Sequence, residues 1–294
     1  MGEVEQWSQA AVAALLRMPT DADDKYSRGV VGLRTGSDAF PGAAVLGVEA
    51  AWRTGAGMVR YLGAGTRARE LVLQRRPETV TADGRVQAWV IGSGTDAAAR
   101  STDETPALRR LLDGDEPVVM DAGALDLAPH ARTPIIVTPH DREHVALRER
   151  LGLAPIGRAA GGTGARADAA RETAVALRGA GVPQPVVLLK GAVTIVADAD
   201  GAVHAVTSGV PWLATAGTGD VLAGVLGALL AGAPDDLAAC AASAAWLHGR
   251  AAAAASAARA GGPIVALDVA EHVASVVGAV LAARPGRAAH EDAP

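Results

Sequence analysis

Short apolar runs alternate with helix-like segments along most of the chain. Six of the runs are bounded by glycine or proline and are typical of buried strands: residues 29–33, 57–62, 87–92, 117–122, 134–139 and 185–191. The segments between them predict helices over 42–56, 104–112, 142–151 and 166–181. Strand–helix alternation requires crossover connections, which place helices on both faces of a mainly parallel sheet. We therefore predict an α/β fold with three layers, α/β/α.

Other stretches depart from this alternation. Residues 194–206 hold two β-rich runs joined by Asp-Ala-Asp-Gly and predict a hairpin. After Gly217 the pattern is almost wholly helical, with helices expected near 218–231, 235–258 and 266–283. The glycine-rich segment 157–168 is expected to be a mobile loop. No linker divides the chain, so we predict a single domain over residues 1–284 and a disordered tail over 285–294.

Composition narrows the class of protein. The chain has 294 residues, half of them apolar, which is enough for a large core without disulfides. Its single cysteine, Cys240, excludes an internal disulfide and is expected to be a small buried hydrophobe. A net charge of −5 with intermixed signs argues against a nucleic-acid partner. Because the N-terminus lacks a basic signal region and no apolar run is long enough to span a bilayer, we expect a cytoplasmic protein with no membrane partner.

The stretch VPWLATAGTGDVLAGVLGALLAG, residues 210–232, carries the most distinctive candidate chemistry. It places Gly217, Thr218, Gly219 and Asp220 at the start of an apolar helix. Helix N-termini bind phosphates through free amides and the helix dipole, and glycines allow the close approach. Asp220 could instead simply cap the helix. No glycine loop is followed by Gly-Lys-Ser/Thr, so there is no Walker A motif.

Two glycine-containing segments suggest contact with a flat ligand. In WVIGSGTDAAA, residues 89–99, Gly92, Gly94 and Ala97 satisfy a G-x-G-x-x-A dinucleotide fingerprint, with Asp113 and Asp115 at about the expected distance. An ordinary strand-to-helix turn is equally compatible with this pattern. Farther upstream, a helix is expected to open at Pro41, and its small residues Gly42, Ala43 and Ala44 would admit a flat ligand or simply close helix packing.

Two polar residues follow predicted strands. His140, in VTPHDREHVAL (residues 137–147), lies just past one strand and near a helix start. Lys190 ends VVLLK and precedes Gly191. A loop histidine is commonly inert, so the residues alone do not decide whether His140 is functional. A lysine at a strand end is commonly solvated, so they also do not decide whether Lys190 lies near a nucleotide.

Taken together and in order, these segments resemble the ADP/ATP-dependent NAD(P)H-hydrate dehydratases of the ribokinase-like superfamily. The resemblance runs from about Lys25 to the C-terminal helices. It rests on KYSRGVVGLRTGSDAFPGAA, IGSG, DAGALDL (121–127), VTPHDRE, LKGAVTIV and LATAGTGDVLAG. The Gly-Thr-Gly-Asp motif is shared with the kinases of that superfamily, whereas the ordered set is specific to the dehydratases. The resemblance implies the ribokinase-like version of the predicted three-layer fold.

The resemblance also implies the roles of individual residues. Nucleotide contacts are expected from Lys190, Gly191, Ala192, Val193, Thr194 and Gly219, and contacts to the hydrated nicotinamide substrate from Ala43, Gly94, His140 and Asp220. Asp220 would be the general base, and Gly217, Thr218 and Gly219 would bind the transferred phosphoryl group. ADP or ATP would be the co-substrate, with Mg²⁺ held mainly by phosphates and water rather than by side chains. We also expect a homo-oligomer, with a tetramer as one candidate.

Several positions depart from the family pattern. Gly123 and Asp126 replace an Asp and an Asn, Asp141 and Arg142 replace Pro-Gly, and Ala216 replaces a Gly. These departures leave room for other functions. A small-molecule kinase of the vitamin-precursor type would use the same Asp220. A nucleotide-binding regulator without turnover and a Rossmann oxidoreductase resting on 92–97 are the remaining alternatives.

Overall fold

The computed structural model describes residues 4–156, 162–207 and 209–284. The expected tail, 285–294, and the first part of the expected mobile loop, 157–161, lie outside these residues. Residues 163–168 of that loop belong to helix α6 (Thr163–Gly179), so the loop prediction was wrong there, and the helix expected over 166–181 begins three residues earlier. Glycines at 162 and 164 concealed the helix start, although Ala167, Ala170 and Ala174 form its buried side.

The described residues form one sheet of nine strands, in the order β1-β9-β8-β7-β6-β5-β4-β2-β3. Neighbouring strands are parallel except at β7–β8 and β8–β9, so the predicted mainly parallel sheet and the hairpin are confirmed. The strands are β1 (Glu5–Gln6), β2 (Val30–Arg34), β3 (Met58–Tyr61), β4 (Ala88–Ile91), β5 (Val118–Met120), β6 (Ile135–Val137), β7 (Pro185–Leu189), β8 (Thr194–Asp198) and β9 (Val203–Val206). Only the two-residue β1 was not expected.

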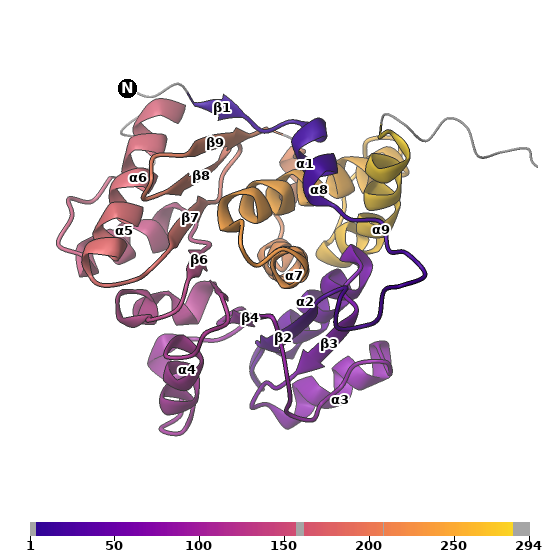
Figure 1. Cartoon of the computed structure of the whole chain (residues 1–294), viewed down its shortest axis with the longest axis horizontal. Helices are drawn as coiled ribbons and strands as arrows, with labels where there is room; N and C mark the ends of the chain where they lie inside the picture. The colour runs from indigo at the N-terminus through magenta and orange to yellow at the C-terminus, as the bar shows by residue number, and fades with distance from the viewer. Residues whose placement is uncertain (1–3, 157–161, 208, 285–294) are drawn as a thin grey trace, which may run out of the picture.

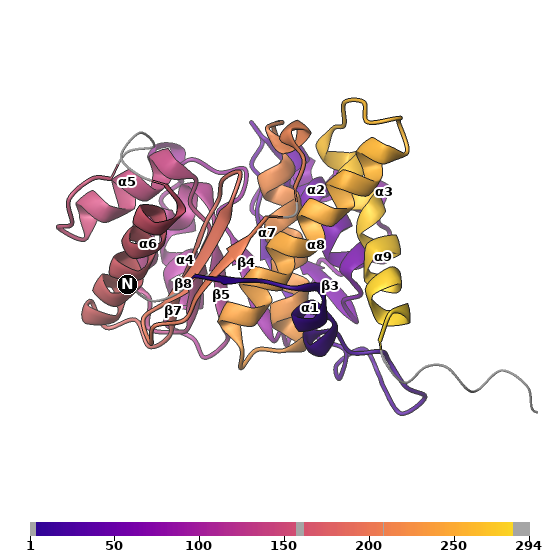
Figure 2. The ribbon, with the colours of Figure 1, turned by 90° about the horizontal axis from the view of Figure 1, so that it is seen from above.

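Helices cover both faces of the sheet, as predicted (Figures 1 and 2). One hydrophobic core joins the sheet to α2 (Pro41–Thr54), α7 (Thr218–Gly232), α8 (Leu237–Ala257) and α9 (Ala266–Ala282), with the short α1 (Gln9–Leu15) beside α8. A second core joins the other face to α4 (Glu104–Leu112), α5 (Asp141–Arg150), α6 and the 3-10 segment η2 (Ala122–His130). Shorter 3-10 turns span Ala97–Ala99 (η1) and Pro211–Leu213 (η3).

Helix α3 (Thr66–Arg75) was not predicted from the sequence. It packs on α2 at the edge of the molecule, and only Ala68 and Val72 are buried. Its four apolar residues include the consecutive run Leu71–Leu73, so the periodic signal is too weak to mark a helix. Cys240 is fully buried on α8, as expected. No helix in the described ranges has the length and apolar character needed to cross a membrane.

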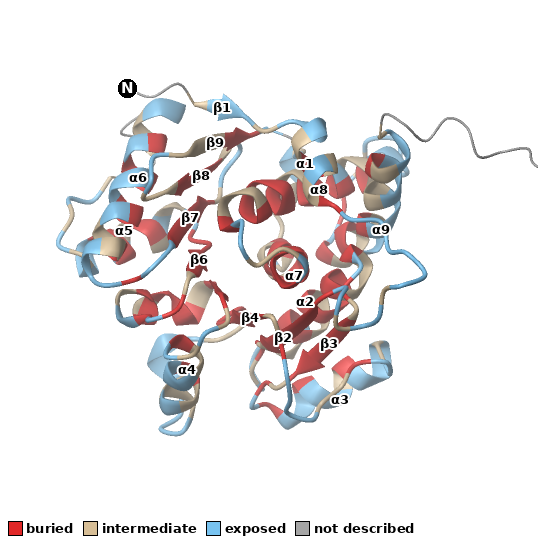
Figure 3. Cartoon of the chain, in the orientation of Figure 1, coloured by how far each residue is buried: buried red, intermediate tan, exposed pale blue. Residues whose placement is uncertain are grey.

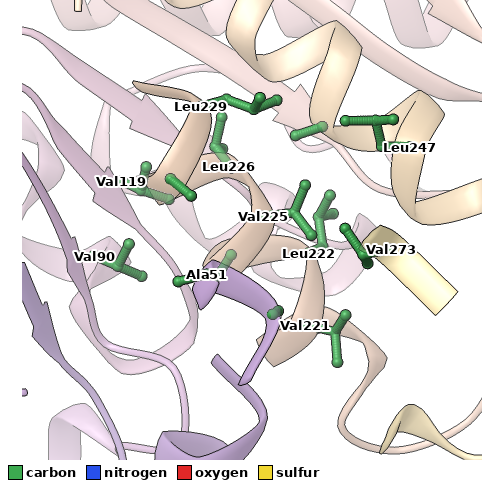
Figure 4. Close-up of a cluster of buried hydrophobic side chains, with 14 of the residues drawn as sticks. Ala51, Val90, Val119, Val221, Leu222, Val225, Leu226, Leu229, Leu247 and Val273 are labelled. Carbon is green, nitrogen blue, oxygen red and sulfur yellow. The ribbon is translucent and has the colours of Figure 1, made fainter. Parts of the chain in front are cut away.

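Helix α7 is the central helix of the molecule and is buried nearly all round (Figure 3). Val221, Leu222, Val225, Leu226 and Leu229 pack among side chains of the sheet, α2, α8 and α9 (Figure 4). Two of its glycines permit this close packing. A Cβ on Gly224 would lie 2.2 Å from the carbonyl oxygen of Gly47 in α2, and one on Gly227 would lie 2.2 Å from Val90 Cγ2. This packing fixes the position of the N-terminus of α7.

Candidate active site

Three of the predicted site residues, together with Asp121, lie where the parallel strands end. Gly94 follows β4, Asp121 follows β5, His140 follows β6 and Lys190 follows β7. In open α/β sheets, ligands bind outside the carboxyl ends of the strands. The N-terminus of α7 reaches the same edge, because a Cβ on Gly219 would lie 3.7 Å from Lys190 Nζ. The structure therefore brings the nucleotide and catalytic motifs together.

Asp121 is the most connected acid at this edge. Its side chain is buried, and Oδ1 accepts hydrogen bonds from Lys190 Nζ and Thr138 Oγ1, both at 2.8 Å. Its Oδ2 accepts from Ser93 Oγ at 3.0 Å. Burial disfavours the charge on Lys190, but the carboxylates of Asp121 and Glu143 outweigh burial and hold the pKa of the ammonium above its usual value. Lys190 is thus a fixed cation beside α7.

The start of α7 has the features of an anion-binding site. Gly217 is the N-cap residue with φ +88°, a conformation that favours glycine, and a Cβ there would lie 2.7 Å from Leu46 Cδ1. Within the described residues, the amides of Gly219 and Asp220 donate to no acceptor. The hydroxyl of Thr218, by contrast, donates to the carbonyls of Leu213 and Thr215. Of this motif, the backbone rather than the threonine side chain is available to an anion.

Asp220 does not cap the helix. It is the third helical residue, and the N-cap has no side-chain hydrogen bond. The part of the chain that the structure describes offers no hydrogen-bond donor to its carboxylate. Burial and the charge of Asp121 raise the pKa of Asp220 to about 6, with Lys190 opposing the shift. A half-buried carboxylate without a structural partner and with its pKa near neutrality has the properties of a general base.

Ala43 and Gly94, predicted to bind substrate, lie against each other. Gly94 has φ +65°, and a Cβ there would lie 2.2 Å from the Cβ of Ala43 in α2. Ser37 Oγ also donates to the Gly94 carbonyl at 2.9 Å. These two small residues are in direct contact and leave space beside the strand ends. A larger side chain at either position would fill that space.

His140 has a structural role that the sequence only hinted at. It is the N-cap of α5, and its Nδ1 accepts from the Glu143 amide at 3.2 Å. Glu143 Oε2 accepts from the His140 amide at 2.8 Å, which completes a capping box. The imidazole is 52% exposed, and its Nε2 lies 3.6 Å from Glu143 Oε1. The capping box therefore holds the imidazole through Nδ1, and about half of the side chain remains exposed.

The segment Lys190–Val193 forms the turn between β7 and β8, and Thr194 is the first residue of β8. The Lys190 amide donates to the Pro139 carbonyl at 2.9 Å, so this turn lies directly beside the segment that carries His140. Gly191 and Ala192 are exposed, whereas Val193 packs partly into the second core. The six predicted nucleotide residues therefore comprise one turn with the first residue of β8 and one helix start, facing each other through Lys190 and Gly219.

Three comparisons identify the family. A family model described as NAD(P)H-hydrate dehydratase matches residues 31–273. The chain belongs to this family. A bifunctional NAD(P)H-hydrate repair enzyme, Nnr, from Mycobacterium tuberculosis is 43% identical over 234 residues, which are 75% of this chain and 44% of that protein. The chain thus spans less than half the length of that curated relative.

Solved structures confirm the fold of this dehydratase family member. The ADP/ATP-dependent NAD(P)H-hydrate dehydratase from Bacillus subtilis, co-crystallized with ATP/Mg²⁺, matches with a TM-score of 0.78 and 26% identity over 94% of this chain and 99% of that chain. A ribokinase-like superfamily protein from Enterococcus faecalis matches with a TM-score of 0.77 and 18% identity over 94% of this chain and 96% of that one, and it supports the fold alone. The predicted ribokinase-like fold is confirmed.

The departures from the dehydratase pattern are accommodated locally. Ala216 stands where the family has a glycine, but its φ is not positive, so the backbone does not require glycine there. Arg100 donates to the Gly123 carbonyl and forms an ion pair of 2.5 Å with Asp126. A Cβ on Gly123 would lie 2.5 Å from the Thr95 carbonyl oxygen. Glycine at 123 therefore permits the close approach of the loop after β4.

The structure of this chain does not complete the dinucleotide-binding motif that the glycine pattern suggests. Gly92 and Gly94 have positive φ, but Ala97 begins only the three-residue η1 instead of an α-helix. Asp113 is the C-cap of α4 and precedes β5, whereas a dinucleotide fold places its acid after the next strand. The glycines serve the turn and the contact with Ala43.

Sequence reasoning missed three residues of the site: Asp121, Glu143 and Arg166. Asp121 lies in a motif that carried the resemblance, and an acid directly after a buried strand was a usable signal. Glu143 and Arg166 act through spatial contacts with Lys190 and its loop, at 3.8 Å from Nζ and 2.8 Å from the carbonyl oxygen respectively. Their sequence separations of 47 and 24 residues concealed these contacts.

The described side chains contain no group of three or more His, Cys, Asp or Glu residues that could hold a metal ion. Both carboxylate oxygens of Asp121 already accept hydrogen bonds, from Lys190 and Thr138 at Oδ1 and from Ser93 at Oδ2. The carboxylates of Glu143 and Asp220 also lie close enough to Lys190 to favour its charge, and carboxylate oxygens are ligands that Mg²⁺ accepts. Such a pair suits an ion that arrives with phosphates and keeps water ligands better than a protein cage.

Proposed function

We propose that the chain catalyses the ADP- or ATP-dependent dehydration of (6S)-hydrated NADH or NADPH to the reduced dinucleotide. The observation that carries this proposal is Asp220, a carboxylate without a hydrogen-bond partner among the described residues and with a pKa of about 6, beside the free amides of α7. Family membership and the Bacillus subtilis structure support the substrate assignment.

The chemistry follows from the leaving group. Hydroxide leaves the hydrated ring poorly, whereas phosphate leaves well. Asp220 would take the proton of the ring hydroxyl while the hydroxyl oxygen attacks the terminal phosphorus of the nucleotide. The bond between that phosphorus and the rest of the nucleotide then breaks. The lone pair of the ring nitrogen then expels phosphate. The carbon next to the one that carried the phosphate loses a proton, which gives the reduced ring. With ADP, the products are NAD(P)H, AMP and phosphate.

Each group of site residues has a place in this proposal. The free backbone amides of Gly219 and Asp220, at the start of the helix that follows Gly217 and Thr218, would bind the developing phosphoryl charge at the positive end of the helix dipole. Lys190 and the turn after it would hold the nucleotide, and Ala43, Gly94 and His140 would border the hydrated ring. Mg²⁺, bound through phosphates with Glu143 and Asp220 nearby, would neutralise phosphate charge. We further propose that a single domain, residues 1–284, performs the reaction, and that it assembles as a homo-oligomer such as a tetramer.

The decisive experiment incubates the purified protein with hydrated NADPH and either ADP or ATP. The expected result is recovery of the reduced-nicotinamide absorbance together with stoichiometric nucleotide cleavage. A stable phosphorylated alcohol without NADPH recovery would support a vitamin-precursor type of kinase instead. Absence of both products, with nucleotide bound, would indicate a regulator without turnover. A reaction without added nucleotide serves as the background control.

A further inference from the structure

Arg166, in the first turn of α6, lies against the turn that follows Lys190. Its Nη1 donates to the Val193 carbonyl at 2.5 Å and its Nη2 donates to the Lys190 carbonyl at 2.8 Å. A Cβ on Gly191 would lie 2.6 Å from Nη2, so the guanidinium fills the space beside this glycine. The side chain of Arg166 therefore hydrogen-bonds to the first and the last residue of the turn between β7 and β8.

This arrangement controls where the amides of the turn point. Because a trans peptide is planar, its N–H points away from its own carbonyl. Holding the Lys190 carbonyl toward α6 thus turns the Gly191 amide away from α6. Within the described residues, the Gly191 and Ala192 amides donate to no acceptor. Both amides are therefore available to a ligand, and the Gly191 amide faces the side of the turn opposite Arg166.

The same guanidinium connects the turn to the segment that carries His140. Arg166 Nη2 lies 3.2 Å from Oδ1 of Asp141, the first residue of α5 and one of the family departures. Two residues farther on, Glu143 approaches Lys190 Nζ at 3.8 Å. Both side chains of the Arg166–Asp141 pair are less than one-third exposed, at 19% and 26%. The charge of the pair is therefore only partly screened by solvent.

Arginine is suited to this position and lysine is not. The planar guanidinium presents five N–H donors in a fixed fork, which can reach two carbonyls and a carboxylate at once. An ammonium is a compact point charge on a flexible stem and cannot span the same acceptors. The geometry therefore depends on the shape of the cation as well as on its charge.

We propose that Arg166 is a positioning residue for the nucleotide: it holds the turn 190–193 in its binding conformation, with Asp141 as its counter-ion. This inference rests on the proposed assignment of that turn to ADP or ATP. Arg166 acts through the backbone of the turn and so affects nucleotide affinity, while the reacting atoms at Asp220 are unaffected.

The test uses Arg166→Ala and Arg166→Lys, with Arg171→Ala as the matched control on the same helix, where Arg171 is half-exposed and 3.9 Å from Asp168. Calorimetry with ADP measures affinity independently of turnover. We expect the ADP Kd to rise at least about tenfold in Arg166→Ala and by a smaller factor in Arg166→Lys. The control should retain parental affinity. In turnover assays, the KM for ADP should rise in parallel, while kcat and the KM for hydrated NADPH stay within about threefold of the parent.

Two further variants change residues that contact the Arg166 side chain. Gly191→Ala would displace the guanidinium without removing it and should also weaken ADP binding. Asp141→Asn should weaken ADP binding less than Arg166→Ala does, because it removes the counter-ion but leaves the two carbonyl contacts of Arg166 in place. These variants keep the test decisive if Arg166→Ala does not fold.

Parental ADP affinity in folded Arg166→Ala or in folded Arg166→Lys and Gly191→Ala would overturn the inference. Equal increases in both Michaelis constants would also overturn it, since they indicate general disorder of the site. If the parent binds ADP but does not dehydrate hydrated NADPH, the proposed function fails, and calorimetry still decides the role of Arg166. A parent that binds neither ADP nor ATP overturns both.

Discussion

At the scale of single residues, the candidate base is held in an unfavourable state. Burial and the neighbouring Asp121 both oppose ionisation of Asp220, and only Lys190 favours it. A carboxyl whose folded pKa is raised stabilises the fold when protonated, and that contribution is lost as pH rises toward and through about 6. At pH 7 the ionised Asp220 therefore costs stability, as functional residues commonly do.

Replacing Asp220 by Asn separates the catalytic role from a structural one. Asn keeps the shape of the side chain but cannot accept the hydroxyl proton, so turnover should fall by about 100- to 10,000-fold. The loss of a negative charge near the phosphates should leave ADP affinity unchanged or higher. Thermal melting at pH 7 should show a midpoint no lower than that of the parent. Near-parental turnover in Asp220→Asn would remove the physical basis for the proposed enzyme.

The pH profile tests the electrostatic origin of that pKa. Because the base must be ionised, kcat/KM of the parent should decline on the acid side around pH 6. Asp121→Asn removes a charge that raises the Asp220 pKa, so the acid limb should move to lower pH even if the overall rate falls. The KM for ADP should rise as well, because Lys190 loses its partner. An acid limb that does not move would contradict this account of the shift.

His140 requires two variants, because it both caps α5 and is predicted to contact substrate. Asn is a good N-cap, so His140→Asn should retain stability, whereas His140→Ala should lose about 1 kcal/mol. If the imidazole contacts the hydrated ring, both variants should raise the KM for hydrated NADPH more than the KM for ADP. A Michaelis constant that changes only in His140→Ala would assign His140 a capping role alone.

At the scale of elements, the crossing of α2 and α7 determines where the anion site lies. The two backbones touch at Gly224 and Gly47, so Gly224→Ala forces the helices apart. Overpacking of this kind costs about 1–3 kcal/mol. Gly278→Ala on α9 is the matched control, because nothing lies within 4 Å of its added Cβ, and it should stabilise the protein by about 0.5–1 kcal/mol. Chemical denaturation measures both changes, and equal stabilities would contradict the close crossing.

At the scale of the whole molecule, a buried charge network ties three helices together. Glu49, fully buried on α2, forms ion pairs with Arg53 on α2, Arg75 on α3 and Arg76 just past α3. Arg75 also forms an ion pair with Glu271 on α9, with 2.6 Å between Nη2 and Oε1. Burial opposes the charge of Glu49, but the arginines outweigh burial and lower the pKa of the carboxyl below its ordinary value of 4.5.

Glu49→Gln should therefore destabilise the protein by about 3 kcal/mol at pH 7, because it leaves partly buried arginines without their carboxylate. A lowered folded pKa gives stability that is present above the ordinary value and lost as pH falls. The difference in melting temperature from the parent should thus narrow below about pH 4.5. Glu78→Gln, at a more exposed pair with Arg76, is the control and should change stability by less than about 1 kcal/mol. A difference that does not vary with pH would contradict the network.

The local pattern of the sequence was sufficient for most of the architecture. Alternating apolar runs and helical periods predicted the strands from β2 to β9, the hairpin and helices α2 and α4 to α9, because buried elements must repeat apolar positions with their own period. The same reasoning failed at β1, α1, α3 and the start of α6, where buried positions are few or are mixed with glycine and charge. Those elements are stabilised by neighbours that the local sequence does not specify.

The sequence by itself determined the types of residues at the strand ends and at the start of α7, together with the family that their order resembles. Only the tertiary structure decided which of them act on one another. It placed Asp121 beside Lys190, left Asp220 without a capping partner and brought Arg166 onto the turn after β7. The physical reason is that a pKa, an open amide and a charge pair depend on distances between segments far apart in the chain, and these distances exist only after the sheet and helices have packed.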